Sequence, residues 1–233
     1  MGTGRLEKKI ILFIVEGTSD RDALSLIISR LINKEEIEFQ VIHGDITADK
    51  FSSQQNIVNR IDKEVKKFLE RTNGIKKEDI LKIVHLIDID GAYIMDEDCF
   101  VEDKSIKKGF IYTENTIKAN KKEKILNRNQ KKSSIISRLV TLPTVGGIEY
   151  SAYYFSCNLD HVLHNERNLS EDLKSEYAFD FVDEFDGRES EFIKFLKESD
   201  FTVPGDYMDT WKFIKDDLNS LGKYCNFHLF FSE

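Results

Sequence analysis

Two short apolar runs in the N-terminal half of the chain each end in acidic residues. Residues 10–15 are followed by Glu16. Residues 82–87 are followed by Asp88 and Asp90. Continuous apolar runs of this length are typical of strands that are buried on both faces of a parallel sheet. Amphipathic stretches separate them, so we predict an α/β fold with a mainly parallel sheet flanked by helices.

The neighbouring stretches complete this pattern. Residues 24–31 carry apolar side chains at helical spacing, residues 38–42 suit a second strand, and residues 57–68 suit a second helix. An aromatic, strand-like segment at 148–155 is expected to rejoin the sheet. Beyond it, the spacing of apolar residues predicts three helices, which would form a helical C-terminal lobe.

A Lys-rich insertion interrupts the predicted sheet. Residues 104–138 carry many Lys and Arg but only two acids. This stretch is either a solvated insertion or an element that grips nucleic acid. Its paired lysines are the candidate phosphate contacts: Lys107, Lys108, Lys121, Lys122, Lys131 and Lys132. We therefore expect an α/β domain over residues 1–156, including this insertion, and an acidic helical region over residues 157–233 packed on it.

Composition limits what the chain as a whole can bind. The formal net charge of -8 at pH 7 repels a phosphate backbone, so any nucleic-acid contact must be local. The 3 cysteines are scattered without zinc-site spacing, which fits a reducing compartment. No apolar run approaches the roughly 20 residues of a membrane span, and no signal peptide is recognisable. We expect a cytoplasmic protein with no membrane partner.

The acids at the strand ends predict a metal site. Open α/β sheets bind ligands at the carboxyl ends of their strands, and neighbouring parallel strands lie about 4.8 Å apart. Glu16, Asp88 and Asp90 can therefore converge on one ion if their strands are adjacent. Carboxylate oxygens suit Mg²⁺, with Mn²⁺ as a possible substitute. Such an ion would neutralise a phosphate and orient an attacking water.

The same residues carry a resemblance to a known family. The sequence ILFIVEG at 11–17, followed by a helix, and the sequence HLIDIDG at 85–91 are similar to the signature of Toprim domains. The resemblance covers roughly the first ninety residues and implies a Toprim-like, Rossmann-like sheet. It also implies that Glu16 is a metal ligand or acid/base group and that Asp88 and Asp90 hold Mg²⁺.

Missing parts favour one kind of protein within that family. The 233 residues have no room for the strand-passage domain of a topoisomerase or for the zinc module and second subdomain of a primase. The chain resembles instead the small standalone Toprim nucleases, which include the overcoming-lysogenisation-defect nucleases of phage defence and small Toprim ribonucleases. This resemblance implies Mg²⁺-dependent cleavage of DNA or RNA, in phage defence or nucleic-acid processing, with a partner ATPase or regulatory protein as a candidate partner.

A second class of function stays open. The alternative is a non-catalytic module of the same fold that binds nucleic acid or a partner protein.

Several other polar residues have two interpretations each. Glu149 is either a further metal ligand, as in some defence-type Toprim nucleases, or an exposed residue beside a turn. His43 and Asp45 follow the second predicted strand and either border the same cleft or serve a turn. His161 and His164 lie three apart on a predicted helix without a third ligand, which favours a surface or capping role over a zinc site.

Overall fold

The predicted α/β sheet is present. In the computed structural model, which describes residues 9–32, 37–41 and 45–232, the main sheet has 6 strands in the order β2-β1-β3-β8-β7, with β9 paired to β8. The four strands β2, β1, β3 and β8 run parallel, whereas β7 and β9 are antiparallel to β8, so the sheet is mixed. Its strands are β1 (Ile10–Val15), β2 (Ile37–Val41), β3 (Ile80–Asp88), β7 (Thr144–Val145), β8 (Ile148–Ser156) and β9 (Tyr224–Cys225).

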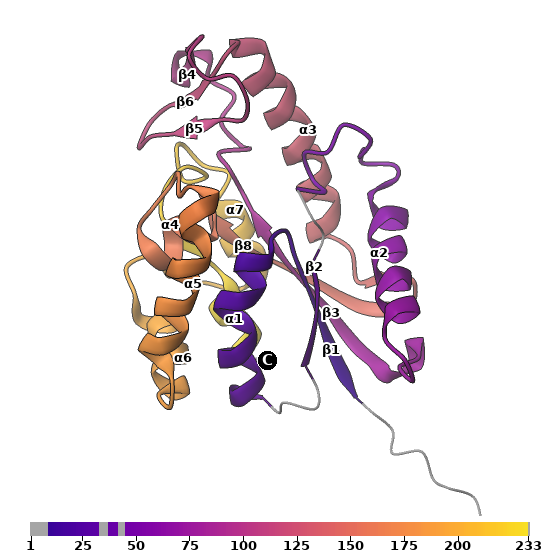
Figure 1. Ribbon diagram of the computed structural model, residues 1–233. Coiled ribbons are helices and arrows are strands. Elements are labelled where there is room, and N and C mark those ends of the chain that lie inside the picture. Colours follow the sequence, from indigo (N-terminus) through magenta and orange to yellow (C-terminus); the bar gives the residue numbers. More distant parts are fainter. Residues whose placement is uncertain (1–8, 33–36, 42–44, 233) are drawn as a thin grey trace, which may run out of the picture.

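Helices cover both faces of this sheet, and side-chain alternation along the strands explains why (Figure 1). Successive residues of a strand point to opposite faces. Leu12 and Ile14 of β1 belong to the core beneath α2 and α3, whereas Phe13 and Val15 belong to the core beneath α1, α5 and α6. The helices are α1 (Thr18–Leu31), α2 (Ile57–Arg71), α3 (Lys122–Val140), α4 (Leu159–His164), α5 (Glu171–Phe185), α6 (Glu189–Glu198) and α7 (Tyr207–Phe213).

The lysine-rich insertion is folded. It supplies strands β5 and β6 and most of α3, and with β4 it builds a second sheet of 3 strands in the order β4-β6-β5. We call this second sheet, residues 100–119, the small lobe; its strands are β4 (Phe100–Glu102), β5 (Ile111–Tyr112) and β6 (Ile117–Ala119). Phe100 and Ile117 pack there against Ile125 of α3. Figure 1 shows the small lobe at one end of the molecule, with α3 running from it down to the main sheet.

The C-terminal region shares the core of the sheet. Trp211 of α7 is fully buried and its ring lies 4.9 Å from that of Tyr154 in β8. Phe227 packs with Phe13 of β1, and β9 adds a strand beside β8. Residues after β8 therefore hold the sheet together rather than forming a separate lobe. None of the helices that the structure describes has the length and apolar character that crossing a membrane requires.

Candidate active site

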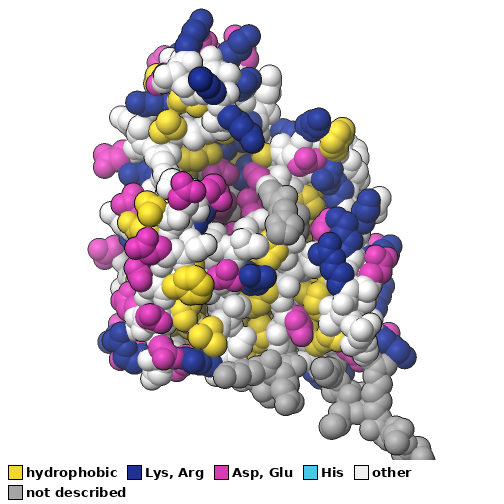
Figure 2. Space-filling model, viewed as in Figure 1, with side chains coloured by type: hydrophobic (Ala, Val, Ile, Leu, Met, Phe, Trp, Pro, Cys, Tyr) yellow, Lys and Arg dark blue, Asp and Glu magenta, His cyan; other side chains and the backbone are white. Residues whose placement is uncertain are grey.

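Adjacent strand ends bring Glu16 and Asp88 to one edge of the sheet. β1 and β3 are neighbours in parallel register, so Glu16 after β1 and Asp88 at the end of β3 emerge on the same side. They line a hollow of about 320 Å³, whose charged lining residues are Glu16, Asp20, Asp88, Glu171 and Lys174. Figure 2 shows acidic side chains where the surface is hollowed below the small lobe, which itself carries many Lys and Arg side chains. The predicted convergence of these two carboxylates is therefore present.

Asp90 lies on a tight turn beyond β3. Its φ of 57° is in the left-handed region, which Asp adopts more readily than most residues. Its backbone N–H donates to the carbonyl of Cys157 at 2.6 Å. The side chain of Asn129 on α3 donates to the carbonyls of Gly91 (3.0 Å) and Ile94 (2.7 Å). The turn is thus fixed both by β8's C-terminal continuation and by α3.

Asp45 reaches the same place from the segment after β2. One of its carboxylate oxygens, Oδ1, accepts hydrogen bonds from the backbone N–H groups of Thr47 (2.7 Å) and Ala48 (3.0 Å). Its other oxygen, Oδ2, points to the side chain of Lys132. Asp45 therefore serves a turn and also contacts Lys132, and it is not among the residues that line the hollow. His43 lies outside the described residues.

Lys132 connects two of these acids. Its Nζ donates to Oδ2 of Asp45 and to Oδ2 of Asp90, each at 2.6 Å, and its side chain is 0% exposed. The expectation that Lys132 contacts phosphate from the protein surface is corrected: α3 turns this side chain inward, among Glu16, Asp45, Asp88 and Asp90. We refer to these four carboxylates as the acid cluster.

Arg128 lies one helical turn before Lys132 and faces the same way. Its Nη1 is 3.9 Å from Oδ2 of Asp90 and 3.3 Å from the hydroxyl of Tyr112. Its guanidinium stacks on the ring of Phe110 at 4.4 Å. Helix α3 therefore supplies two buried cations to the acid cluster and ties them to the small lobe.

The electrostatic balance differs across the cluster. Burial, followed by repulsion from Asp45 and the other acids, raises the pKa of Glu16 well above its usual value, and Lys132 only partly opposes this. Burial and then Asp20 and Asp90 likewise raise the pKa of Asp88. At Asp45, by contrast, burial would raise the pKa, but the attraction of Lys132 together with hydrogen bonds from Lys132, Thr47 and Ala48 lowers it. The surroundings therefore disfavour the charged form of Glu16 and Asp88 and favour that of Asp45.

Two further acids extend the cluster beyond Asp88. Burial raises the pKa of Asp20 in α1, and burial raises that of Asp160 in α4 to about 6. Lys174 of α5 faces them, with Nζ 3.6 Å from Oδ2 of Asp160 and 3.0 Å from Oε1 of Glu171. Sequence reasoning missed both acids. The position of Asp20, one helical turn after Glu16, is a signal that could have identified it, whereas Asp160 has no local signal.

The donor set fits a hard divalent cation. Glu16, Asp20 and Asp88 offer carboxylate oxygens, which Mg²⁺ prefers, and Oε1 of Glu16 is buried without a hydrogen-bond partner. As the side chains stand, no group of three or more His, Cys, Asp or Glu in the described part of the chain is arranged to hold a metal ion. Asp90 is bound to Lys132, and Asp88 Oδ1 accepts the N–H of Leu159 at 2.8 Å. Side chains must therefore turn for an ion to be held.

Glu149 is far from this site. It lies at the start of β8 and pairs in register with Lys82, whereas Asp88 pairs with Phe155. At about 3.3 Å per residue, this offset places Glu149 about 20 Å from Asp88 along the strand direction. Its Oε1 lies 3.3 Å from Nζ of Lys82. The metal-ligand expectation for Glu149 is thereby corrected, and its position is that of an exposed residue beside a turn.

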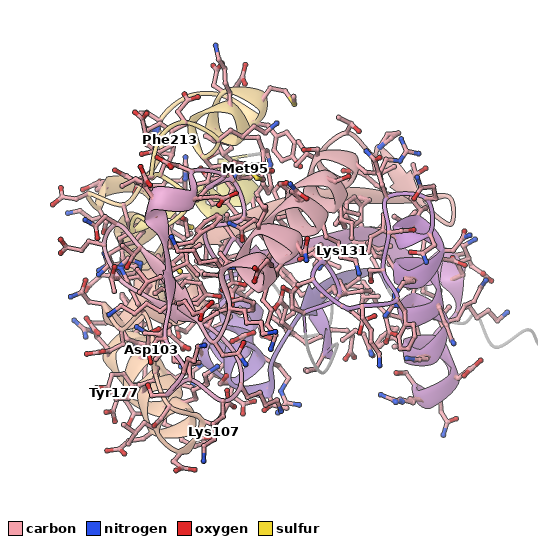
Figure 3. All side chains as sticks on the ribbon, turned by 90° about the horizontal axis from the view of Figure 1, so that it is seen from above. Met95, Asp103, Lys107, Lys131, Tyr177 and Phe213 are labelled. Carbon is pink, nitrogen blue, oxygen red and sulfur yellow. The ribbon has the colours of Figure 1, made fainter. Side chains whose placement is uncertain are left out.

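The remaining candidate lysines surround the small lobe. Four of them are exposed, namely Lys107, Lys108, Lys121 and Lys122, and Lys131 is half-buried. Lys122 donates to the carbonyl of Glu97 at 3.2 Å. Figure 3, seen from above, shows Lys107 and Lys131 at well-separated places around the lobe and α3. These lysines are therefore distributed around the lobe rather than gathered in one patch.

The two histidines of α4 have packing roles. His161 is buried, its Nδ1 accepts the N–H of Cys157 at 3.4 Å, and burial lowers its pKa to about 4. His164 packs edge-on against the rings of Tyr177 and Phe181. They do not share a metal site in this arrangement.

No protein-family model matches the chain, and neither a curated protein nor a solved structure matches it significantly. The functional interpretation of the acid cluster therefore depends on its own geometry.

Proposed function

We propose that the protein is a Mg²⁺-dependent hydrolase that cleaves nucleic-acid phosphodiester bonds with a Toprim-type site. One observation carries the proposal. Glu16 and Asp88 converge from adjacent parallel strand ends on a hollow, and there Oε1 of Glu16 is buried with no hydrogen-bond partner among the described residues. Buried polar atoms are nearly always satisfied, so an orphaned carboxylate oxygen beside another carboxylate favours a cation site.

In this proposal the described residues divide the work. Glu16 and Asp88, with Asp20 beside them, would hold the ion. Asp90, which was predicted as a ligand, would instead remain paired with Lys132. The bound ion would supply charge neutralisation at the scissile phosphate. Glu16, which lines the hollow beside Asp88, would position the attacking water or accept its proton.

Positive charges near the acids suit a polyanionic substrate. Without them, the cluster would repel phosphate, and the net charge of -8 would add to that repulsion. Exposed lysines lie on the small lobe and at the start of α3, and Figure 2 shows basic side chains above the acidic hollow. We infer that this basic surface draws a DNA or RNA strand across the site, and that its binding weakens as salt rises.

Cleavage assays test the proposal directly. The purified chain, with Mg²⁺ or Mn²⁺, is incubated with plasmid, single-stranded DNA and RNA. We expect at least one of them to be cut, a complete loss of cutting with a chelator, and a loss of about 10²-fold or more for Glu16→Gln. Glu149→Gln is the matched control, because it changes an exposed glutamate away from the cluster. No cutting of any substrate, or equal cutting by Glu16→Gln, would overturn the proposal.

One observation favours a second candidate, a non-catalytic module that binds nucleic acid or a partner protein. Lys132 already neutralises Asp45 and Asp90 without a metal ion, so this part of the site is stable as it is. Such a module would retard nucleic acid on a gel, and Asp88→Asn would leave that retardation unchanged while no cutting occurs.

We also propose that the protein acts in the cytoplasm. Cys99, Cys157 and Cys225 are all free thiols, which suits a reducing compartment.

A further inference from the structure

Lys132 stands between two carboxylates in the way that a bridging metal ion would. Its ammonium is 2.6 Å from Oδ2 of Asp45 and 2.6 Å from Oδ2 of Asp90, and no part of its side chain is exposed. Lysines are almost never fully buried unless they are paired. The position is therefore a built feature of the fold.

Hydrogen bonds that involve the backbone fix the positions of Asp45 and Asp90. Oδ1 of Asp45 accepts two backbone N–H groups, from Thr47 and Ala48, so Oδ2 is left to face the lysine. Asp90 sits on the turn fixed through Cys157 and Asn129. The two carboxylates and the ammonium of Lys132 belong to different parts of the chain, so the tertiary structure specifies their pairing.

Helix α3 presents this cation as part of a stripe. Arg128, Lys132 and Ile136 follow one another at four-residue intervals, and all three are buried. Nη1 of Arg128 lies 3.9 Å from the same Asp90 oxygen that binds Lys132. Two protein cations therefore face the same oxygen of Asp90, and Lys132 is bound to it directly.

On the other side of the acid cluster, no ion pair joins Glu16 or Asp88 to a cation within residues 9–32, 37–41 and 45–232. In the same part of the chain Oε1 of Glu16 is buried without a hydrogen-bond partner, and Oδ1 of Asp88 accepts the N–H of Leu159. Both line the hollow, whereas Lys132 is fully buried and is not among the residues that line it. The cluster thus offers one place for an added cation.

We propose that Lys132 is a resident cation in place of a second metal ion, so that the site takes a single divalent ion, on Glu16 and Asp88. The inference depends on the proposed function, because it concerns how the same site is charged. Asp45 and Asp90 then serve to hold the lysine. As a fixed point charge beside the hollow, the ammonium would attract a phosphate without having to be bound from solution.

Counting bound Mn²⁺ tests this inference. The full chain, freed of metals, is titrated with Mn²⁺, and free Mn²⁺ is followed by electron paramagnetic resonance. We expect one ion per wild-type chain and two for Lys132→Met, in which Asp45 and Asp90 lose their cation. Lys131→Met is the matched control, because it removes the neighbouring, half-buried lysine, and it should bind one ion.

Each outcome bears on the inference. Two ions on the wild-type chain, or a folded Lys132→Met that still binds one, would overturn it and leave the proposed function standing. No ion on the wild-type chain would overturn both. If Lys132→Met does not fold, Glu16→Gln decides: loss of the single wild-type ion supports the inference, and retention of that ion overturns it.

Discussion

Replacing Lys132 with methionine is expected to lower the stability of the protein strongly at neutral pH. Methionine keeps most of the length and apolar volume of the lysine stem but removes the ammonium. Asp45 and Asp90, whose side chains are 20% and 17% exposed, then lose their shared partner. Removing one partner of a buried ion pair costs about 3–5 kcal/mol. For a chain of this size, that corresponds to a fall in Tm of about 6–20 °C.

The loss should depend on pH in a definite direction. Because Lys132 lowers the pKa of Asp45 in the folded state, the pairing stabilises the protein above the carboxyl's ordinary pKa of 3.8 and loses that effect as pH falls through the lowered folded value. In Lys132→Met, the unpaired carboxylates are instead relieved when they take up protons. The difference in stability between the two proteins is therefore largest at pH 7 and shrinks toward pH 4.

Urea denaturation followed by tryptophan fluorescence measures this difference, since Trp211 is fully buried. Lys131→Met is the control and should stay within about 0.5 kcal/mol of the wild-type free energy of unfolding. A Lys132→Met chain as stable as wild type at pH 7 would refute the structural role given to the lysine. A loss of equal size at pH 7 and pH 4 would refute its electrostatic origin.

Two further predictions concern single titrating groups. Glu16→Gln should raise the free energy of unfolding at pH 7 in the absence of metal, because the raised pKa of Glu16 means that its charged form opposes folding. Denaturation of both chains in chelator measures this, and a less stable variant would contradict it. Burial lowers the pKa of His85 in the folded protein to about 4, below its ordinary value of 6.5. As pH falls from 6.5 toward 4, the unfolded chain takes up a proton at this residue before the folded protein does, which lowers the free energy of unfolding by about 3 kcal/mol. His85→Gln should therefore lose less stability than wild type between pH 7 and pH 4.5, and an identical loss in both would show that His85 does not titrate in the fold.

The sheet and two of its acids could be predicted because their signals are local. An apolar run such as residues 10–15 can be satisfied only inside a sheet or a core, and the first polar residue after it must leave at the strand's end. Glu16 and Asp88 were placed correctly on that basis. Parallel pairing then brought the two ends together, as the βαβ pattern had indicated.

Glu149 shows where the same reasoning was applied at the wrong end of a strand. The residue precedes the aromatic run of β8, so in a parallel sheet it must begin the strand at the edge opposite Asp88. The family resemblance offered Glu149 as a metal ligand, although strand direction alone excludes it from the acid cluster.

The role of Lys132 could not be predicted from composition. A lysine-rich stretch suggests a solvated surface, and burial of one member is decided by tertiary contacts with Asp45 and Asp90. The helical spacing could have indicated that Lys132 is buried, since Arg128 and Lys132 lie on the same face of α3 as the buried Ile125 and Ile136. A cation within an apolar stripe is a candidate for a buried ion pair.

Helix α3 connects the small lobe to the main sheet. At about 1.5 Å per residue its 19 residues span about 28 Å, with Ile125 anchored in the small lobe and Leu139 in the core of the main sheet. Lys132 and Asn129 lie between these anchors. The same helix therefore carries the small lobe, with its exposed lysines, and sets the positions of the ammonium and of the Asp90 turn.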